Sequence, residues 1–356
     1  VGAPGDAGAG NALFDAGAVS LLSFADTAFN GAQLVGTAGL GYAGPNDIDV
    51  TDLELGSGFG LSVALNAAGD RMAVGELGGE FQTGPVRLFS FSDTAFSNGQ
   101  LVLTIGQGQD FEILPMPRSF GSGLALNGSG DRLAIGAAGD DGAGGPAFSS
   151  RGAVYLVGFS DNSFANPQVL AILGSGYAGA NDLDLPLDDG DRFGTSVALN
   201  DDGTILAAGA ARDDSDGNAV TNAGAAYLIG FADTDFTGGQ VDGVLGQGYA
   251  GSPALGLAPG DEFGTAVAFD ATADLLAVGA PGDDGFDESR SGSGAVHLLA
   301  RSGGSSDPAT GQTFAANPDT DVTITPASIA AILNAGTALT LQANNDITVD
   351  QALVVN

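Results

Sequence analysis

Short runs of alternating apolar and polar residues recur along most of the chain and predict an all-β fold. In the clearest copy, residues 195–199 and 205–210 flank the turn Asn200-Asp201-Asp202-Gly203, and residues 225–231 form a third apolar run. Two alternating runs joined by a tight Asp-Gly turn predict a β-hairpin. The third run extends this hairpin into a meander of short strands.

The same landmarks return in order about every 70 residues, which indicates an internal repeat. One landmark is the phenylalanine of a Phe-Gly pair, found at Phe59, Phe120, Phe193 and Phe263. The other is the glycine that opens the third run, found at Gly17, Gly84, Gly152, Gly224 and Gly294. A period of this length, carrying about four strands, exceeds a solenoid coil and favours the blades of a β-propeller.

The landmarks divide residues 1–303 into five blades, the first without its opening strand and the last with three strands. Their predicted bounds are 1–53, 54–118, 119–190, 191–260 and 261–303. The chain begins inside a repeat, which favours a fragment or a processed piece of a longer protein. The open sheet edges at the two ends can be closed within the chain, by blades outside this sequence, or by a neighbouring molecule.

Two pairs of motifs resemble the FG-GAP repeat of integrin-α-type β-propellers. Phe193-Gly194 is followed by Ala207-Ala208-Gly209-Ala210, and Phe263-Gly264 by Val278-Gly279-Ala280-Pro281. The resemblance covers roughly residues 1–303. Blades of that family often carry a calcium loop, Asp-x-Asp/Asn-x-Asp-Gly, between these strands. The turn at residues 200–203 is too short to wrap an ion, so that metal site is not carried over.

The pattern changes after a Gly/Ser-rich linker, residues 304–318. Residues 338–349, ALTLQANNDITV, resemble the rungs of filamentous-haemagglutinin-like exoproteins, in which short strands stack into a parallel β-helix. The resemblance implies that residues 319–356 begin or cap such a helix, because a lone rung cannot bury its own face. A β-hairpin packed on the propeller is the alternative.

Charge and composition exclude several classes of function. Asp and Glu outnumber Lys and Arg by 43 to 9, for a net charge of −34. Such a field repels phosphate backbones and anionic membrane surfaces, so we expect no nucleic-acid partner. No apolar run approaches the ~20 residues that a membrane span needs, so we expect no membrane insertion. The absence of cysteine excludes disulfides and thiol chemistry.

Acidic loops follow the second strand of several blades and are candidate calcium sites. Short carboxylates among glycines favour turns, and they are also the usual oxygen ligands of calcium. Their spacing does not match an EF-hand loop, so solvated turns are the alternative. The candidate metal ligands are Asp140, Asp141, Asp213, Asp214, Asp216, Asp283, Asp284 and Asp287.

Two further sets of loop residues are candidate binding sites. A second acidic cluster precedes a Phe-Gly pair and comprises Asp182, Asp184, Asp188, Asp189 and Asp191. It is interpreted as the solvent-exposed face of a strand edge. Binding of a metal or of a basic partner is the alternative interpretation. Matching Gly-Tyr-Ala-Gly loops contain Tyr42, Tyr177 and Tyr249. Their rings can stack on sugars or plug the gaps between blades.

Little in the sequence supports catalysis. The chain has no lysine for a phosphate-binding loop, and its single histidine, His297, falls inside a strand. The two resemblances together imply a non-enzymatic adhesion or cell-surface structural module of a large secreted bacterial protein, with calcium as a possible stabiliser. Its expected partner is a cell-surface protein or glycan, or other copies of itself. The alternatives are a lectin-like propeller that uses the tyrosine loops, and a self-assembling fibre subunit that exchanges strands.

Overall fold

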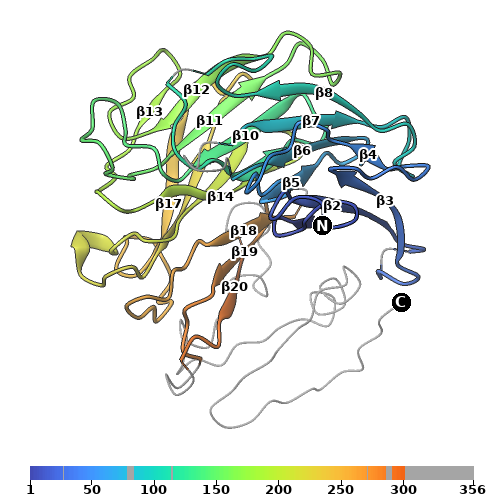
Figure 1. Ribbon diagram of the computed structural model, residues 1–356. Helices are drawn as coiled ribbons and strands as arrows, with labels where there is room; N and C mark the ends of the chain where they lie inside the picture. Colours follow the sequence, from blue (N-terminus) through green and yellow to red (C-terminus); the bar gives the residue numbers. More distant parts are fainter. Residues whose placement is uncertain (27, 78–83, 114, 271, 286–290, 301–356) are drawn as a thin grey trace, which may run out of the picture. The chain divides into compact units, whose positions relative to one another are not determined.

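The computed structural model describes residues 1–26, 28–77, 84–113, 115–270, 272–285 and 291–300. Their strands form five sheets that follow one another in chain order and are the five blades of a β-propeller (Figure 1). The predicted all-β propeller is therefore confirmed. Nearly all described residues belong to one compact unit, Val1–Leu298. The predicted linker 304–318 and the β-helix-like segment 319–356 lie outside the described residues.

Each blade is an antiparallel meander, and blades 1 and 3 add a short parallel strand at one edge. Blades 1 and 2 consist of β1 (Gly2–Ala3), β2 (Ala18–Ser23), β3 (Gln33–Gly39) and β4 (Ile48–Asp49), and of β5 (Ser62–Leu65), β6 (Arg71–Gly75), β7 (Val86–Ser90) and β8 (Gln100–Ile105). Blade 3 consists of β9 (Phe120–Leu126), β10 (Arg132–Ala137), β11 (Ala153–Gly158), β12 (Gln168–Gly174) and β13 (Leu183–Asp184). Blades 4 and 5 consist of β14 (Phe193–Leu199), β15 (Ile205–Ala210), β16 (Ala225–Gly230) and β17 (Gln240–Gly246), and of β18 (Ala266–Phe269), β19 (Leu275–Ala280) and β20 (Ala295–Ala300).

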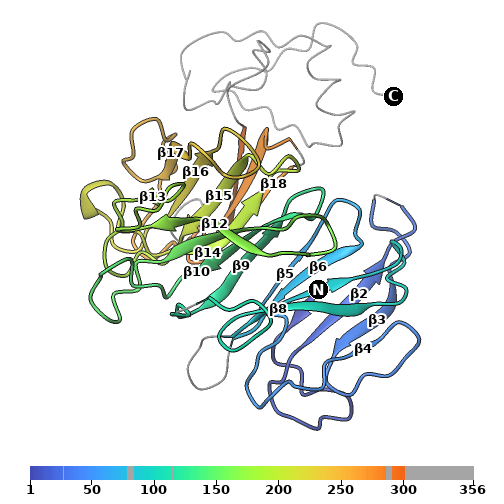
Figure 2. The same ribbon diagram turned by 90° about the horizontal axis from the view of Figure 1, so that it is seen from above.

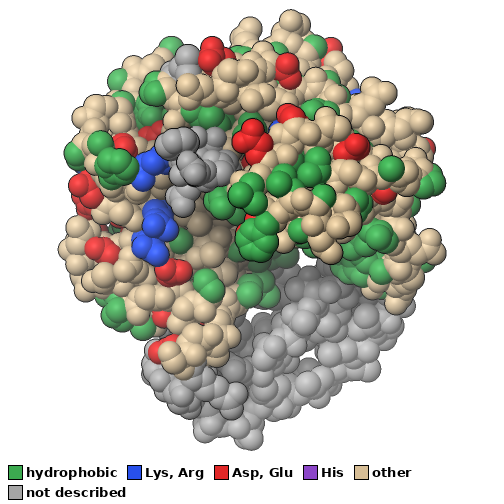
Figure 3. All heavy atoms as spheres, in the orientation of Figure 1, with side chains coloured by type: hydrophobic (Ala, Val, Ile, Leu, Met, Phe, Trp, Pro, Cys, Tyr) green, Lys and Arg blue, Asp and Glu red, His purple; other side chains and the backbone are tan. Residues whose placement is uncertain are grey.

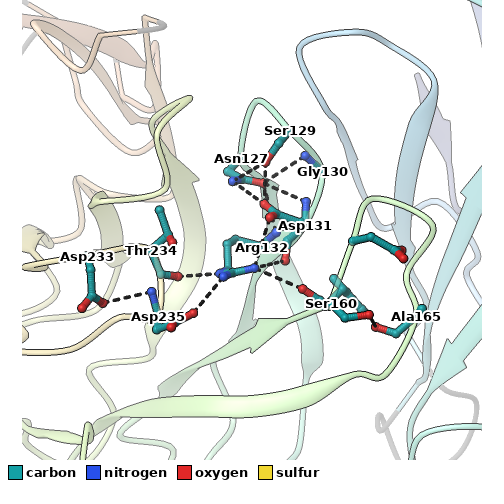
Figure 4. Close-up of polar contacts among 12 residues, drawn as sticks. Asn127, Ser129, Gly130, Asp131, Arg132, Ser160, Ala165, Asp233, Thr234 and Asp235 are labelled. Carbon is teal, nitrogen blue, oxygen red and sulfur yellow. Dashed lines mark hydrogen bonds and ion pairs between the residues drawn. The ribbon is translucent and has the colours of Figure 1, made fainter.

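An asparagine fixes the tight turn between the first two strands of a blade. The Asn127 side-chain oxygen accepts the backbone N–H groups of Gly130, Asp131 and Arg132 at 3.0–3.1 Å (Figure 4). Asn66 and Asn200 accept the equivalent bonds in blades 2 and 4. A side chain that satisfies consecutive N–H groups favours a turn over a continued strand. The hairpin therefore reverses where the sequence pattern predicted.

Neighbouring blades approach one another so closely that glycine is required. A Cβ on Gly209 in β15 would overlap the carbonyl oxygen of Gly264, and one on Gly136 in β10 would overlap that of Gly194. The phenylalanine of each Phe-Gly pair is fully buried, and Phe263 forms a parallel β-bridge with Gly224 of the preceding blade. The repeated Phe-Gly and Gly-Ala motifs are therefore devices for joining one blade to the next.

The hydrophobic core lies between blades as well as within them. Strand β9 contacts β5 on one side and β14 on the other, and β14 contacts β18, so successive sheets lie side by side (Figure 2).

Two arginine side chains also reach from one blade to the next. Arg132 donates to the carbonyl of Thr234 and pairs with Asp235 at 2.8 Å in blade 4 (Figure 4). Arg71 makes the equivalent bond to the carbonyl of Asn162 in blade 3.

Candidate functional site

The acidic loops that follow the second strands are organised by pairs of adjacent aspartates. The first aspartate of each pair accepts the backbone N–H two residues later, which starts the loop as a tight turn. Asp140, Asp213 and Asp283 accept these bonds at 2.7–2.8 Å. Asp6 makes the same bond in blade 1. Asp140 and Asp213 are also buried. The first aspartate is therefore part of the loop's framework.

The second aspartate of each pair ties down the far end of the same loop. Asp214 accepts the N–H of Asn222 at 2.7 Å, and Asp284 accepts that of Gly292 at 2.6 Å. Asp141 accepts from Phe148 and Ser150 and pairs with Arg118 at 3.0 Å. Partial burial opposes ionisation of Asp141, but these donors outweigh it and hold its pKa below the ordinary value. The acidic doublets thus close the loops that they begin.

The three loop tyrosines place their hydroxyl groups on the first aspartates. Tyr177 donates to Asp140 at 3.0 Å, Tyr249 to Asp213 at 2.8 Å, and Tyr42 to Asp6 at 3.0 Å. Burial, followed by the effect of neighbouring groups, raises the pKa of Tyr249 above its ordinary value. A protonated phenol is a donor that a buried carboxylate needs. The hydroxyl groups therefore hold the loops, and the three tyrosines are partly buried.

Blade 2 replaces this arrangement with a buried ion pair. Glu76 stands in its Gly-Ala motif, and Arg87 occupies the third-strand position of Tyr155 and Tyr227. Arg87 pairs with Glu76 through Nε and donates to both oxygens of Asp52 at 2.9 Å through Nη1. This ion pair was not predicted from the sequence. Both positions differ from the equivalent residues of the other blades, and this paired difference is the sequence signal that could have revealed the ion pair.

The second acidic cluster also holds backbone rather than converging on one point. Asp182 accepts the N–H groups of Ile172 and Gly179, and Asp184 accepts that of Gly176. Asp189 forms an ion pair with Arg151 at 2.8 Å on the surface. The remaining members are Asp188, which accepts from Asn218, and Asp191, which is buried. These residues lie along one edge of blade 3 and the turn that leads into blade 4.

Asp191 is the buried carboxyl group of that cluster. It is 6% exposed, and it accepts the N–H of Asp188 at 2.7 Å. Burial, together with the charges of Asp213, Asp188 and Asp214, raises its pKa to about 7. In blade 2 the equivalent residue is Ser57, whose hydroxyl accepts the N–H of Glu54 at 2.8 Å. A neutral side chain can therefore hold this turn.

Replacing Asp191 with serine should remove one source of pH-dependent stability. The carboxyl of Asp191 stays protonated in the fold up to about pH 7, whereas in the unfolded chain it ionises near pH 4. Its contribution to stability is therefore present below pH 4 and lost as the pH rises to about 7. We expect the melting temperature of the native chain to fall more than that of Asp191→Ser between about pH 4.5 and 8. Parallel pH dependences of the two proteins would refute the assignment.

The calcium sites stay predictions. In the part of the chain that the structure describes, no three His, Cys, Asp or Glu side chains are grouped so as to hold a metal ion. Asp216 is exposed in a short 3-10 turn (Asp216–Asn218), and Asp287 lies outside the described residues. On the face in Figure 3, acidic side chains are scattered singly among neutral and hydrophobic ones.

A cavity of about 770 Å³ lies where the end of blade 2 meets the acidic loop of blade 3. Its lining includes Met116, Arg118, Phe148, Ile172 and Tyr177. The Phe148 ring is 80% exposed, and the Arg118 guanidinium lies 4.8 Å from its centre. The backbone of Phe148 adopts a φ of 69°, a left-handed conformation that is costly for a bulky residue. Three of the lining residues, Asp140, Asp141 and Tyr177, were candidate site residues from the sequence, whereas Met116, Arg118, Phe148 and Ile172 were not.

Contacts with the surrounding loop hold the exposed Phe148 in its left-handed backbone conformation. The N–H of Phe148 donates to Asp141 at 2.9 Å, and Asp141 in turn pairs with Arg118. The guanidinium over the ring adds a cation–π contact. Phe148 is thus held at the mouth of the cavity by the same carboxylate that closes the loop.

The fold and its repeated loops define a β-propeller, and one known repeat family matches part of it. The FG-GAP repeat matches residues 187–229 and 254–299. These two segments contain most of the described strands of blades 4 and 5. Blades 4 and 5 are thus similar to FG-GAP repeats, and the other blades share the same landmarks. No curated protein matches the sequence.

Two solved structures are similar to the chain at low sequence identity. Hydrazine synthase from Kuenenia stuttgartiensis matches at 10% identity and a TM-score of 0.35, over 67% of this chain and 45% of its own. The periplasmic gluconolactonase PpgL of Pseudomonas aeruginosa matches at 14% identity and a TM-score of 0.43, over 80% of this chain and 61% of its own. This chain thus spans about half the length of these two structures. Similarity this low carries no argument about function. Among the described residues, no helix is long and apolar enough to cross a membrane.

Proposed function

We propose that this chain is a non-enzymatic adhesion module of a secreted or surface-exposed bacterial protein, and that it binds a cell-surface protein at the cavity beside Phe148. The observation that carries the proposal is the 80%-exposed Phe148, held in a left-handed conformation beside Arg118 and Met116. Aromatic residues, arginine and methionine are the types enriched in the buried centres of protein interfaces. Backbone strain at an exposed aromatic residue favours a role for that residue in binding.

The hydrogen bonds within the acidic loops support the same proposal. Their aspartates and tyrosines satisfy one another and the loop backbone, as Asp140 and Tyr177 show. Loops positioned by a rigid scaffold are where binding residues are usually found. FG-GAP repeats and the strong negative charge suit an extracellular setting. The carboxylates thus serve as the scaffold, and the apolar rim of the cavity as the contact.

Replacing Phe148 with alanine should abolish most of the adhesion. Truncating a central aromatic contact costs about 2 kcal/mol, which corresponds to a roughly 30-fold weaker affinity. The measurement counts beads coated with each protein that remain on cultured host cells after washing. Since the ring is exposed, the fold should be retained, with an unchanged melting temperature.

Phe14→Ala is the matched control for this assay. Phe14 lies in the corresponding loop of blade 1 and is 72% exposed, so it tests general surface stickiness. We expect Phe14→Ala beads to adhere like unmodified ones. Equal loss of adhesion in both variants, or in neither, would contradict a binding site at Phe148.

A carbohydrate partner is the second candidate, because Tyr177 lines the same cavity. Its hydroxyl is engaged by Asp140, which leaves the ring for stacking on a sugar. Tyr42 and Tyr249 are engaged in the same way, but they do not line this cavity. Enzymatic removal of glycans from the cells before the bead assay separates the two candidates. Loss of adhesion after that treatment would favour the lectin-like alternative.

A further inference from the structure

Blade 5 exposes a surface that the corresponding strands of earlier blades bury. The third strands of blades 1, 2 and 3 share a valine and a leucine two residues apart, and all six side chains are at most 3% exposed: Val19, Leu21, Val86, Leu88, Val154 and Leu156. The equivalent residues of β20 are Val296 and Leu298, which are 69% and 78% exposed. Because sequence and register agree, the difference arises because no further blade follows blade 5 among the described residues. We call Val296, Leu298 and the nearby Leu275 the tail face.

Blade 1 exposes the opposite half of the same interface. The turn between the third and fourth strands carries two phenylalanines in edge-to-face contact, with ring centres 5.0–5.1 Å apart. The second of them is 7% exposed in blade 2, 2% in blade 3 and 0% in blade 4, at Phe96, Phe164 and Phe236. In blade 1 the equivalent Phe29 is 73% exposed and its partner Phe24 is 42% exposed. We call Phe24, Phe29 and the adjacent Ala28 the head face.

These two halves share one hydrophobic cluster at each of three junctions between successive blades. Val154 and Leu156 of blade 3 share a buried cluster with Phe236 of blade 4. The same association joins Val86 and Leu88 to Phe164, and Val19 and Leu21 to Phe96. A head face set on a tail face would therefore recreate an apolar cluster that this chain already forms at three junctions.

The rim of the interface carries an ion pair at the junction of blades 3 and 4 but apolar residues on the head and tail faces. Arg132 at the start of β10 reaches the turn of the next blade and pairs with Asp235 (Figure 4). In blade 5 the position of Arg132 is taken by Leu275, which is 45% exposed. In blade 1 the position of Asp235 is taken by Ala28, which is also exposed. The same two positions are also apolar in interior blades, at Ile205 of blade 4 and Ala95 of blade 2, so the ion pair is not required at this rim and two apolar residues can meet there.

We propose that the tail face of one molecule binds the head face of a second copy of this chain. The two faces lie at opposite ends of the row of blades and both are exposed, so they do not cover each other within one molecule. Burying exposed valine, leucine and phenylalanine side chains supplies the driving force. Because the two faces differ, the contact is heterologous, and it generates closed rings or open filaments. The interaction is separate from the cavity at Phe148.

Two variants, each with one face disabled, test this assembly by sedimentation velocity. Val296→Asp disables the tail face, and Phe29→Asp disables the head face; both residues are exposed, so the fold should persist. We expect the native chain to form species larger than a dimer as its concentration rises from about 1 to 100 μM. Each variant alone should be monomeric. The buffer needs at least physiological ionic strength, because the net charge of −34 opposes association.

An equal mixture of the two variants is the decisive sample. One intact head and one intact tail remain between them, so the mixture should form dimers and nothing larger. Neither a symmetric contact nor closure of one chain on itself would restore dimers in this way. Leu101→Asp is the control, because Leu101 is 40% exposed and its counterparts Leu34, Val169 and Val241 are exposed as well. This control should assemble like the native chain.

Other occupants of the two faces would give different results. A native chain that stays monomeric throughout this concentration range would overturn the proposal, and would mean that something other than a second copy covers these faces. A native chain that assembles although both face variants also assemble would overturn it too, because the contact would then lie elsewhere. A mixture of variants that stays monomeric is equally incompatible with it.

Discussion

Arg87→Ala should destabilise the fold by about 3–5 kcal/mol, the usual cost of removing one partner from a buried ion pair. Arg87 and Glu76 are each 3% exposed. Burial raises the pKa of Glu76, and the neighbouring guanidinium offsets part of that effect. Without Arg87 the fold must either bury an unpaired carboxylate or take up a proton. Urea denaturation of the two proteins at neutral pH measures the difference in the free energy of unfolding.

The double variant Glu76→Ala/Arg87→Tyr is the matched control. It gives blade 2 the residues that blade 3 carries at these positions, Ala137 and Tyr155. Because no charge is then buried, this variant should be clearly more stable than Arg87→Ala. A double variant that is as unstable as the single one would show that the arginine acts through its packing rather than through its charge.

Gly209→Ala should cost about 1–3 kcal/mol or more, because an extra methyl group has no room at the junction of blades 4 and 5. Its Cβ would overlap the carbonyl oxygen of Gly264. Backbone atoms of two sheets cannot shift apart without loosening the whole junction. Thermal melting, followed by the loss of near-ultraviolet circular dichroism, measures the change in stability.

Gly279 provides an internal comparison for that substitution. It occupies the same place in blade 5 that Gly209 occupies in blade 4, but the nearest atom to an added Cβ is the side chain of Ala266 at 3.4 Å. Gly279→Ala should therefore be close to neutral. If both alanine variants lost the same stability, the cost would come from the strand itself and not from the approach of the next blade.

Most of the fold could be predicted from the pattern of strands and turns in the sequence. The turn at residues 200–203 and the recurring Phe-Gly pairs predicted five meanders and their order, because each meander is built from contacts that are local in sequence. The asparagine that caps the turn is likewise a local signal. The reason for the repeated glycines was not accessible, since the carbonyl that approaches Gly209 comes from Gly264 in another blade.

The roles of the acidic residues were harder to predict for the same reason. Asp213 and Tyr249 lie 36 residues apart, and their contact follows only once β16 and β17 are placed beside the loop. A carboxylate that accepts backbone N–H groups is indistinguishable in sequence from one that awaits an ion. The cavity at Phe148 was missed because neither Met116 nor Phe148 belongs to the repeated pattern. Val296 looks like Val154 in sequence, and only the structure shows that one is exposed and the other buried.

The central claim is that this chain acts by binding a partner through the surface around Phe148. The most direct measurement is competition, in which soluble protein is added to cells before beads coated with the native chain. Soluble native chain should block the beads in a saturable way. Soluble Phe148→Ala should block only at a roughly 30-fold higher concentration. If native chain and variant compete equally well, or if neither displaces the beads, the surface around Phe148 is not where this protein binds.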